Sequence, residues 1–396
     1  MINFILSLLR AAVNDSSPIS PPADVNWELL YQFFENQSLA CTAWYGIMKL
    51  EEKDRPDKDI LNKFQKSMLT VRGRESMQQL ELENVMAHFE KEGIDYVPLK
   101  GWIIKNLYPK PDMRSMCDVD ILIRDEDKKK IPVIMKACGF NLMHRGQCDD
   151  EYIKPPTITT EIHRSLFSVT TPFYEYFANA MDKTVPLDKS HQRRMTIEDF
   201  YLHIIAHLAK HFGGSGTGLR PILDIWILEK YNAGNNTFDK NYFYSELEKL
   251  KLKDFYNIIS GIAKKWFSEN EETGTKNDDN AYTNSEIEEY ILMNSTYGSI
   301  KSWASNNINK VSGNKFVYYT KRLFPGIHFM KNQFWILDKM PFLLPFCWVL
   351  RGIRIIIFKR DHVSDELKVI NSNTENKAYI EKLARIKKLA GLDDID

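Results

Sequence analysis

Two aspartates one residue apart lie in the stretch Arg114-Ser115-Met116-Cys117-Asp118-Val119-Asp120-Ile121-Leu122-Ile123. Residues 119–123 are apolar apart from Asp120, which predicts a β-strand. Because side chains alternate along a strand, Asp118 and Asp120 share one face and the apolar residues point into the core. Neighbouring carboxylates repel each other, and burial raises that cost. The pair therefore indicates either a divalent cation bridging both groups, such as Mg²⁺ with nucleotide phosphates, or a strand end that meets solvent.

The charge balance and the cysteines argue against several classes of protein. Lys and Arg together number 53, as do Asp and Glu, so the formal net charge is zero and general nucleic-acid binding is not expected. The five cysteines are scattered without a CxxC spacing, which argues against a disulfide framework or a zinc site and favours a cytoplasmic protein. The first ten residues are apolar but lack the flanks of a signal peptide, and we expect them to begin an amphipathic helix.

Hydrophobic periodicity divides the 396 residues into three regions. We expect residues 1–93 to be helical, with Gly93 capping a long helix. Residues 94–190 are expected to form a core of alternating strands and helices, and residues 191–396 to be mostly helical. The predicted strands are 94–99, 118–123, 140–144, 151–154 and 158–164, and the predicted helices between them are 101–107 and 125–138. The fold class is therefore α+β: a small mixed β-sheet core with helices, flanked by predominantly helical N- and C-terminal regions.

A glycine turn precedes the aspartate strand. Gly101 follows a predicted strand and opens a short helix, whose first backbone N–H groups can hold a phosphate. Lys100 beside it could neutralise phosphate charge. On the later strand, Glu161 shares a face with Thr159 and His163, so it supplies a third carboxylate if the two strands are neighbours.

These motifs together resemble the polymerase-β-like nucleotidyltransferase superfamily, and within it a family of largely uncharacterised bacterial nucleotidyltransferases often associated with surface-polysaccharide gene clusters. The residues that carry the resemblance are Leu99-Lys100-Gly101, Tyr108-Pro109, Arg114, Asp118-Val119-Asp120 and Glu161-Ile162-His163. One departure is Gly101-Trp102, where the superfamily usually has Gly-Ser or Gly-Gly. The serine hydroxyl that would contact phosphate is therefore missing.

The resemblance implies an enzyme that uses Mg²⁺ or Mn²⁺ to move a nucleotidyl group from a nucleoside triphosphate to a small-molecule, sugar or protein acceptor. It implies catalytic metal ligands, which are Asp118, Asp120 and Glu161, with Glu161 holding a second metal ion or deprotonating the acceptor. It also implies a set of residues that bind the nucleotide and its phosphates, namely Lys100, Gly101, Arg114 and His163. The alternatives are a non-catalytic nucleotide-binding or regulatory protein on the same fold, and a phosphotransferase that modifies a glycan.

For two of these residues, the sequence allows two roles. Arg114 either contacts phosphate or pairs with the aspartates and holds them apart. His163 either contacts substrate or is a strand histidine whose hydrogen bonds are satisfied within the protein.

For three segments outside the motifs, the sequence also leaves alternatives open. His203, His207 and His211 recur every four residues on one helical face, which suits a metal site. Alternatively, His207, His211 and Asp224 form a buried polar network or reach across to the nucleotide site. The glycine-rich loop 213–218 is either a flexible connection or a substrate lid. The apolar region 324–359 either makes peripheral contact with a membrane surface or packs on the core or on a partner chain.

Overall fold

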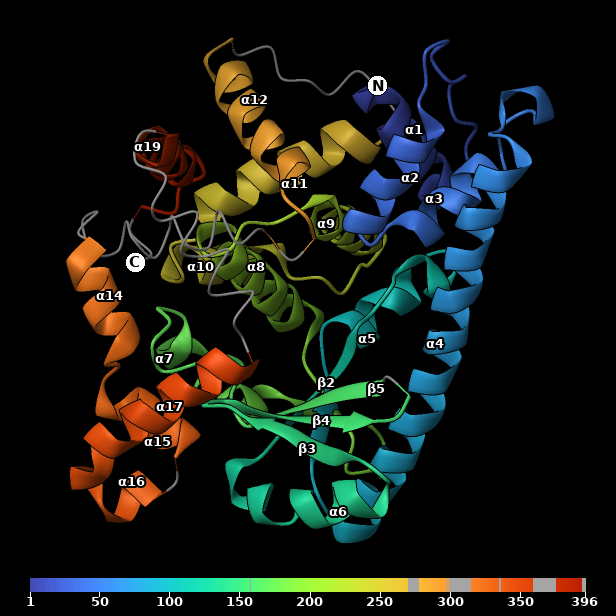
Figure 1. The fold of residues 1–396 in the computed structure, drawn as a ribbon. Helices are drawn as coiled ribbons and strands as arrows, with labels where there is room; N and C mark the ends of the chain where they lie inside the picture. Colours follow the sequence, from blue (N-terminus) through green and yellow to red (C-terminus); the bar gives the residue numbers. More distant parts are fainter. Residues whose placement is uncertain are drawn as a thin grey trace.

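A five-stranded mixed sheet forms the centre of the computed structural model, which describes residues 1–156, 158–269, 278–296, 298, 315–334, 336–358 and 375–393 (Figure 1). The strands are β1 (Tyr96–Pro98), β2 (Asp118–Ile123), β3 (Asn141–Arg145), β4 (Asp149–Lys154) and β5 (Ile158–His163). Their order across the sheet is β1-β2-β5-β4-β3. The pair β2–β5 is parallel and the other pairs are antiparallel. The predicted α+β class and mixed sheet are therefore confirmed.

The two faces of the sheet differ in chemistry because side chains alternate along β2 and β5. Val119, Ile121 and Ile123 pack with apolar side chains of α4 (Lys58–Glu92) and α6 (Ile131–Ala137). The opposite face of β2 carries Asp118 and Asp120, as the alternation predicted. In Figure 1, α4 runs along one side of the molecule from the N-terminal helices to the sheet.

Helices account for most of the remaining described chain. Those before the sheet are α1 (Ile2–Asn14), α2 (Trp27–Asn36) and α3 (Ala40–Ile47). Those within and after it are α5 (Gly101–Ile104), α7 (Tyr174–Phe177), α8 (Ile197–Gly213), α9 (Leu219–Ala233), α10 (Lys240–Lys249), α11 (Lys253–Phe267), α12 (Asp278–Met293), α14 (Lys315–Leu323), α15 (Ile327–Gln333), α16 (Ile336–Lys339), α17 (Leu344–Phe358) and α19 (Glu375–Leu389). A two-residue pair, β6 (Val185–Pro186) and β7 (Arg193–Arg194), forms a second small sheet.

Helix ends follow the signals in the sequence in some places and depart from them in others. Gly93 ends α4 in the left-handed region, with φ of 65°, as its position predicted. The predicted helix 125–138 is wrong in its first part, where residues 125–129 form a 3₁₀ helix and α6 begins only at Ile131. Pro132 explains this start, because proline lacks an N–H group and is accommodated in the first turn of a helix.

One large hydrophobic core joins the N-terminal helices to those that follow the sheet. It contains Leu8 and Leu9 of α1, Ile205 of α8 and Leu223 of α9, each fully buried. The same core reaches the sheet through Leu122 of β2. The helical layer over the acidic face of the sheet is thus fixed by apolar packing.

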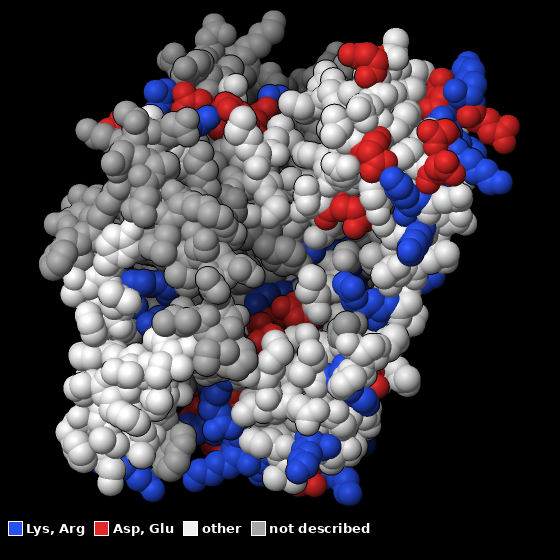
Figure 2. All heavy atoms as spheres, viewed as in Figure 1, with Lys and Arg blue, Asp and Glu red and all other residues white. Residues whose placement is uncertain are grey.

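The C-terminal apolar region behaves differently from that core. Within 324–358, Met330, Leu337 and Cys347 form a small buried cluster of their own. Phe342, Phe346 and Val349 remain 75%, 60% and 59% exposed, and Figure 2 shows a broad uncharged surface on this side of the molecule. Among the described residues, none of the helices combines the length and the apolar character needed to cross a membrane. Residue 359 lies outside the described residues.

Candidate functional site

The acidic face of the sheet opens into a cavity of about 410 Å³, which we call the sheet–helix cavity. Its sheet wall carries Asp118, Asp120 and Glu161, and the wall opposite is formed by α8 and α9. Figure 2 shows acidic and basic side chains meeting in a hollow near the middle of the face in view. A concave site that gathers titratable groups of both signs is where binding or catalysis is expected.

Strand register brings Asp120 and Glu161 together. β2 and β5 are parallel neighbours in which Asp118 lies opposite Thr159 and Asp120 lies opposite Glu161. Directly paired residues point to the same face of a sheet, so the carboxylates converge on the cavity. The sequence-based condition that the two strands be neighbours is therefore met.

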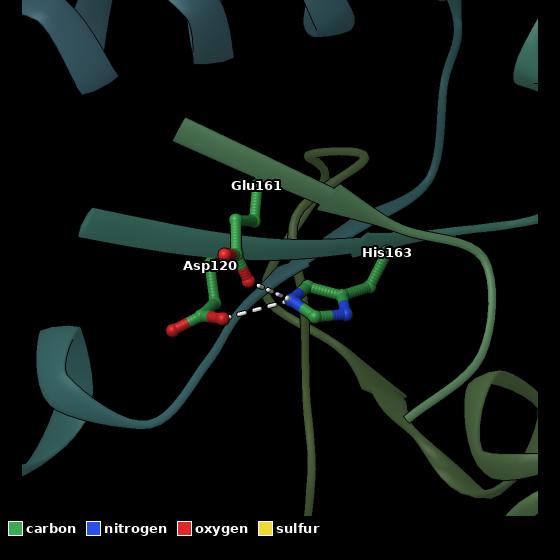
Figure 3. A group of neighbouring side chains, drawn as sticks. All are labelled: Asp120, Glu161 and His163. Carbon is green, nitrogen blue, oxygen red and sulfur yellow. Dashed lines mark hydrogen bonds and ion pairs between the residues drawn. The ribbon is translucent and has the colours of Figure 1, made fainter. Parts of the chain in front are cut away.

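His163 completes a compact group with these two carboxylates (Figure 3). Its Nε2 atom lies 2.8 Å from Asp120 Oδ1 and 3.2 Å from Glu161 Oε2. One ligand atom from each of the three residues lies within 4.8 Å of the others, a spacing that could hold a metal ion. Asp118 lies outside this group but lines the same cavity.

Lys100 supplies a second cation to the same carboxylate. Its Nζ atom lies 2.7 Å from Asp120 Oδ1, and both side chains are largely buried. The backbone beside it is held in place because the Leu99 N–H donates to the Asp120 carbonyl at 2.9 Å. Lys100 itself has φ of 43°, a conformation that non-glycine residues rarely adopt. The chain thus turns sharply at the end of β1 and directs the ammonium group toward β2.

Burial and neighbouring charges shift the pKa of Asp118, Asp120 and His163. Burial, followed by the negative charges of Asp120 and Glu161, raises the pKa of Asp118 to about 6. Burial also opposes ionisation of Asp120, but Lys100 and His163 outweigh it and hold the pKa of that carboxyl below its usual range. Burial and Lys100 disfavour a charged His163, yet its hydrogen bonds, among which that to Asp120 counts most, together raise its pKa to about 10. Near neutral pH, two internal cations therefore lie against Asp120, and the three carboxylates of this wall still outnumber them.

The residues present fit a hard divalent cation. Asp118, Asp120 and Glu161 offer carboxylate oxygens, which Mg²⁺ and Mn²⁺ prefer. Burial and then the charges of Asp120 and Glu161 disfavour ionised Asp118, and a bound cation would offset that repulsion. The imidazole of His163 suits Mn²⁺ better than Mg²⁺ as a further donor, once it has lost its proton.

Arg114 lies in the cavity wall, but its main partner is not an aspartate of the pair. Its Nε and Nη2 groups donate to the two oxygens of Asp224 at 2.9 Å each, and Tyr108 donates to Asp224 Oδ1 at 2.8 Å. The bond to Asp224 does not test the interpretation that Arg114 holds the two aspartates apart, which stays a prediction. A phosphate contact by Arg114 stays a prediction.

Gly101 is required by this ion pair. A Cβ atom at Gly101 would lie 2.3 Å from Arg114 Nη1 and 2.8 Å from the sulfur of Met116. Only glycine leaves room for the guanidinium at this distance. The helix that Gly101 opens, α5, is only four residues long, and Gly101 lines the cavity. Phosphate binding by its backbone stays a prediction.

Trp102 stands where the superfamily usually has serine or glycine, but its side chain does not face the cavity. The residue is absent from the cavity lining and packs instead against the apolar cluster on the other face of the sheet. Lys105 lies over its ring, with Nζ 3.5 Å from the ring centre. The departure from Gly-Ser therefore removes a hydroxyl without filling the cavity.

The helical wall contributes residues that the sequence motifs did not single out as ligands. Lys210 of α8 and Arg220 of α9 line the cavity opposite the carboxylates. Arg220 donates through Nη1 to the Ser115 carbonyl at 3.0 Å, which ties α9 to the segment preceding β2. Their position opposite the carboxylates depends on how the helices dock on the sheet. Thr217 of the glycine-rich loop also lines the cavity and is buried.

The three α8 histidines are neutral groups at different depths. His207 and His211 line the cavity, with their Nε2 atoms 3.2 Å apart, and burial lowers the pKa of both, to about 4 for His211. His203 is fully buried beside Phe167 and Phe177, and burial lowers its pKa to about 3. Neither ring nitrogen of His203 has a hydrogen-bond partner in the described part of the chain.

The predicted polar network of His207, His211 and Asp224 is present only in part. The two imidazoles contact each other, whereas Asp224 bonds to Arg114 and Tyr108. A metal site made of the α8 histidines is not among the ligand groups found in the described residues, where the group found is the one on the sheet.

Comparison with known proteins supports a function for this cavity. No curated protein and no solved structure matches the chain. A family model does match, over residues 23–268, and this range includes both walls of the sheet–helix cavity. Because the match covers more than half of the chain, the protein belongs to the family described as uncharacterised nucleotidyltransferase.

Proposed function

We propose that this protein is a polymerase-β-like nucleotidyltransferase that moves a nucleotidyl group from a nucleoside triphosphate to a hydroxyl group of a small-molecule, sugar or protein acceptor. One observation carries the proposal: Asp118, Asp120 and Glu161 lie on adjacent parallel strands and face one cavity whose opposite wall is cationic. Family membership supports the reaction class. A place in surface-polysaccharide metabolism rests on the sequence resemblance alone.

Carboxylates of the sheet wall would hold the metal ion, Mg²⁺ or Mn²⁺. Asp118 and Asp120 are the first ligands, and Glu161 is the third carboxylate. When bound, the ion would stabilise negative charge on the triphosphate and on the attacking oxygen. Lys100 and His163, which neutralise Asp120 in the described state, would then be released toward the phosphates.

The helical wall would orient the triphosphate. Lys210 and Arg220 place positive charge across the cavity from the carboxylates. Phosphate oxygens between the two walls would bring the reacting phosphorus close to the acceptor hydroxyl, which is the main requirement for phosphoryl and nucleotidyl transfer. Glu161 would take the proton of that hydroxyl or hold a second metal ion.

A second candidate is a nucleotide-binding protein without catalysis. The observation that favours it is the charge balance of the described state, in which Lys100 and His163 already satisfy Asp120. Internal cations could replace the metal ion and leave a site that binds phosphates but turns nothing over. A glycan phosphotransferase remains a variant of the first proposal, with a different leaving group.

Calorimetric titration of the four nucleoside triphosphates, with and without Mg²⁺ or Mn²⁺, and pyrophosphate release together test both candidates. We expect metal-dependent binding in the wild type and its loss in Asp118→Asn, where only the charge changes. Glu151→Gln is a matched control, because Glu151 lies directly opposite Glu161 on β4 but does not line the cavity. Equal affinity in the wild type and Asp118→Asn would overturn the metal role. Binding without turnover across a panel of acceptors would favour the second candidate.

A further inference from the structure

A second cavity lies between the C-terminal half of α9 and the helices α10 and α11. Its volume is about 390 Å³, and it shares no lining residue with the sheet–helix cavity. Its lining residues are Tyr201, Trp226, Glu229, Lys230, Asn232, Ala233, Phe238, Lys240, Phe243, Tyr244, Tyr256 and Lys264. Because half of these are aromatic, we call it the aromatic cavity.

Asn232 is the residue that points to a ligand. Its side chain lines the aromatic cavity, and the residue is only 7% exposed. Neither the amide nitrogen nor the amide oxygen has a hydrogen-bond partner in the described residues. A buried amide without partners is costly, so such groups are usually satisfied by water or by a bound molecule. The amide offers donors and an acceptor side by side, which suits a ring carrying both kinds of group.

Contacts between its own side chains hold the aromatic walls of the cavity in place. Tyr201 and Phe243 stack with centroids 4.9 Å apart at 14°, and Tyr256 packs edge-on against both. The Tyr201 and Tyr256 hydroxyls both donate to Glu229 Oε1, at 2.6 and 2.7 Å. These contacts fix the polar end of the cavity. Aromatic side chains gain free energy by packing against a planar or ring-shaped ligand.

The charges around the cavity favour an anion. Three lysines, Lys230, Lys240 and Lys264, line it against a single carboxylate, Glu229. The Lys230 ammonium also donates to Asn14 Oδ1 at 3.3 Å, a neutral partner that leaves its positive charge in place. Lys264 Nζ lies 3.5 Å from Glu229 Oε2 and so offsets that carboxylate. A quaternary ammonium ligand, which aromatic cavities often hold, is disfavoured by this excess of positive charge. A phosphate group is the complementary choice for clustered lysines.

We propose that the aromatic cavity binds a small phosphorylated ring compound, either a nucleoside monophosphate or a sugar phosphate. Its ring lies against the aromatic side chains and hydrogen bonds to Asn232, and its phosphate faces the lysines. This site is separate from the one that carries the proposed transfer reaction, since the two cavities have no residue in common.

Saturation-transfer NMR and calorimetry on the full chain in EDTA test the proposal. The probes are adenosine 5′-monophosphate, uridine 5′-monophosphate and glucose 1-phosphate, with adenosine, glucose and inorganic phosphate as controls. Without divalent ions, metal-dependent binding in the sheet–helix cavity is suppressed. We expect at least one phosphorylated probe to bind, and its unphosphorylated form to bind at least about tenfold more weakly. Comparing the affinity of the two nucleotides with that of glucose 1-phosphate shows whether the cavity prefers a nucleobase or a sugar ring.

Substitutions show which of the two cavities binds the probe. Asn232→Leu and Lys240→Gln should each weaken binding about tenfold or more, whereas Asn241→Leu, an exposed position on the same helix as Lys240, should not. Asp120→Asn should leave this binding unchanged whether or not the chain has transferase activity. If no probe binds and Asn232→Leu is simply more stable, the cavity holds water and the proposal fails. Binding that survives Asn232→Leu but is lost in Asp120→Asn would overturn it as well.

Discussion

The two walls of the sheet–helix cavity are built in different ways. The sheet wall places its three carboxylates on two hydrogen-bonded strands, where register fixes which side chains meet. The helical wall takes Lys210 and Arg220 from two helices whose place over the sheet depends on the packing of the large core and on bonds from α9 to Ser115 and Arg114. We therefore expect the sheet wall to set the chemistry and the helical wall to set substrate affinity. Substitutions on each side can separate the two roles.

The largest effect is expected on the sheet wall. Asp120→Asn should lower kcat for pyrophosphate release by about a thousandfold, because the metal ion would lose one of the carboxylates that hold it beside Glu161. The substitution also weakens the partner of buried Lys100, so the melting temperature must be followed in parallel. A variant that remains folded and keeps more than a tenth of the wild-type kcat would show that the sheet wall does not carry the chemistry.

The link between the two walls should matter for stability. Asp224→Ala should lower the free energy of unfolding by about 3 kcal/mol, because it leaves the buried Arg114 guanidinium without its bidentate partner and Tyr108 without its acceptor. Urea denaturation measures this change. Asp182→Ala is the matched control: Asp182 pairs with Arg124 but is 65% exposed at its side chain, so its loss should be small. Equal effects in both variants would contradict a special role for the buried pair.

The sheet-side residues were accessible to sequence reasoning because their geometry is local. Side chains alternate along a strand with a period of two, and this rule assigned the two faces of β2 and β5. It correctly placed Asp118, Asp120 and Glu161 on the same face of the sheet. The same reasoning could not find Asp224 as the partner of Arg114, because 110 residues separate them and only helix docking brings them together. It also could not show that Gly101 makes room for Arg114 or that Trp102 turns away from the cavity.

Burial of His203 in the helical wall should make the free energy of unfolding fall in acid. Its pKa is about 3 in the folded protein and near 6.5 when unfolded, so below pH 6.5 the unfolded chain binds a proton that the folded chain does not. Stability is therefore lost as pH falls, by about 2 kcal/mol between pH 7 and pH 5 from this residue alone. His203→Phe should reduce that loss, whereas substitution of exposed His144 should not. An unchanged pH dependence in His203→Phe would show that His203 is not the source.

The smallest effect is expected where the helical wall meets the substrate. Lys210→Gln should raise the KM for the nucleoside triphosphate about tenfold with little change in kcat, because it removes charge that binds the phosphates in every state. Steady-state kinetics across several triphosphate concentrations separates the two constants. A fall in kcat as large as that of Asp120→Asn would show that the helical wall contributes to the chemical step as much as the sheet wall does.

Helix α9 joins the two cavities of the molecule. Its first two turns present Arg220 and Asp224 to the sheet–helix cavity, and its later turns present Trp226, Glu229 and Asn232 to the aromatic cavity. One helix of 15 residues moves as a unit, so any shift along its axis on filling one cavity is transmitted to the other. By thermodynamic linkage, the factor by which one ligand changes the affinity of the second equals the factor by which the second changes the first.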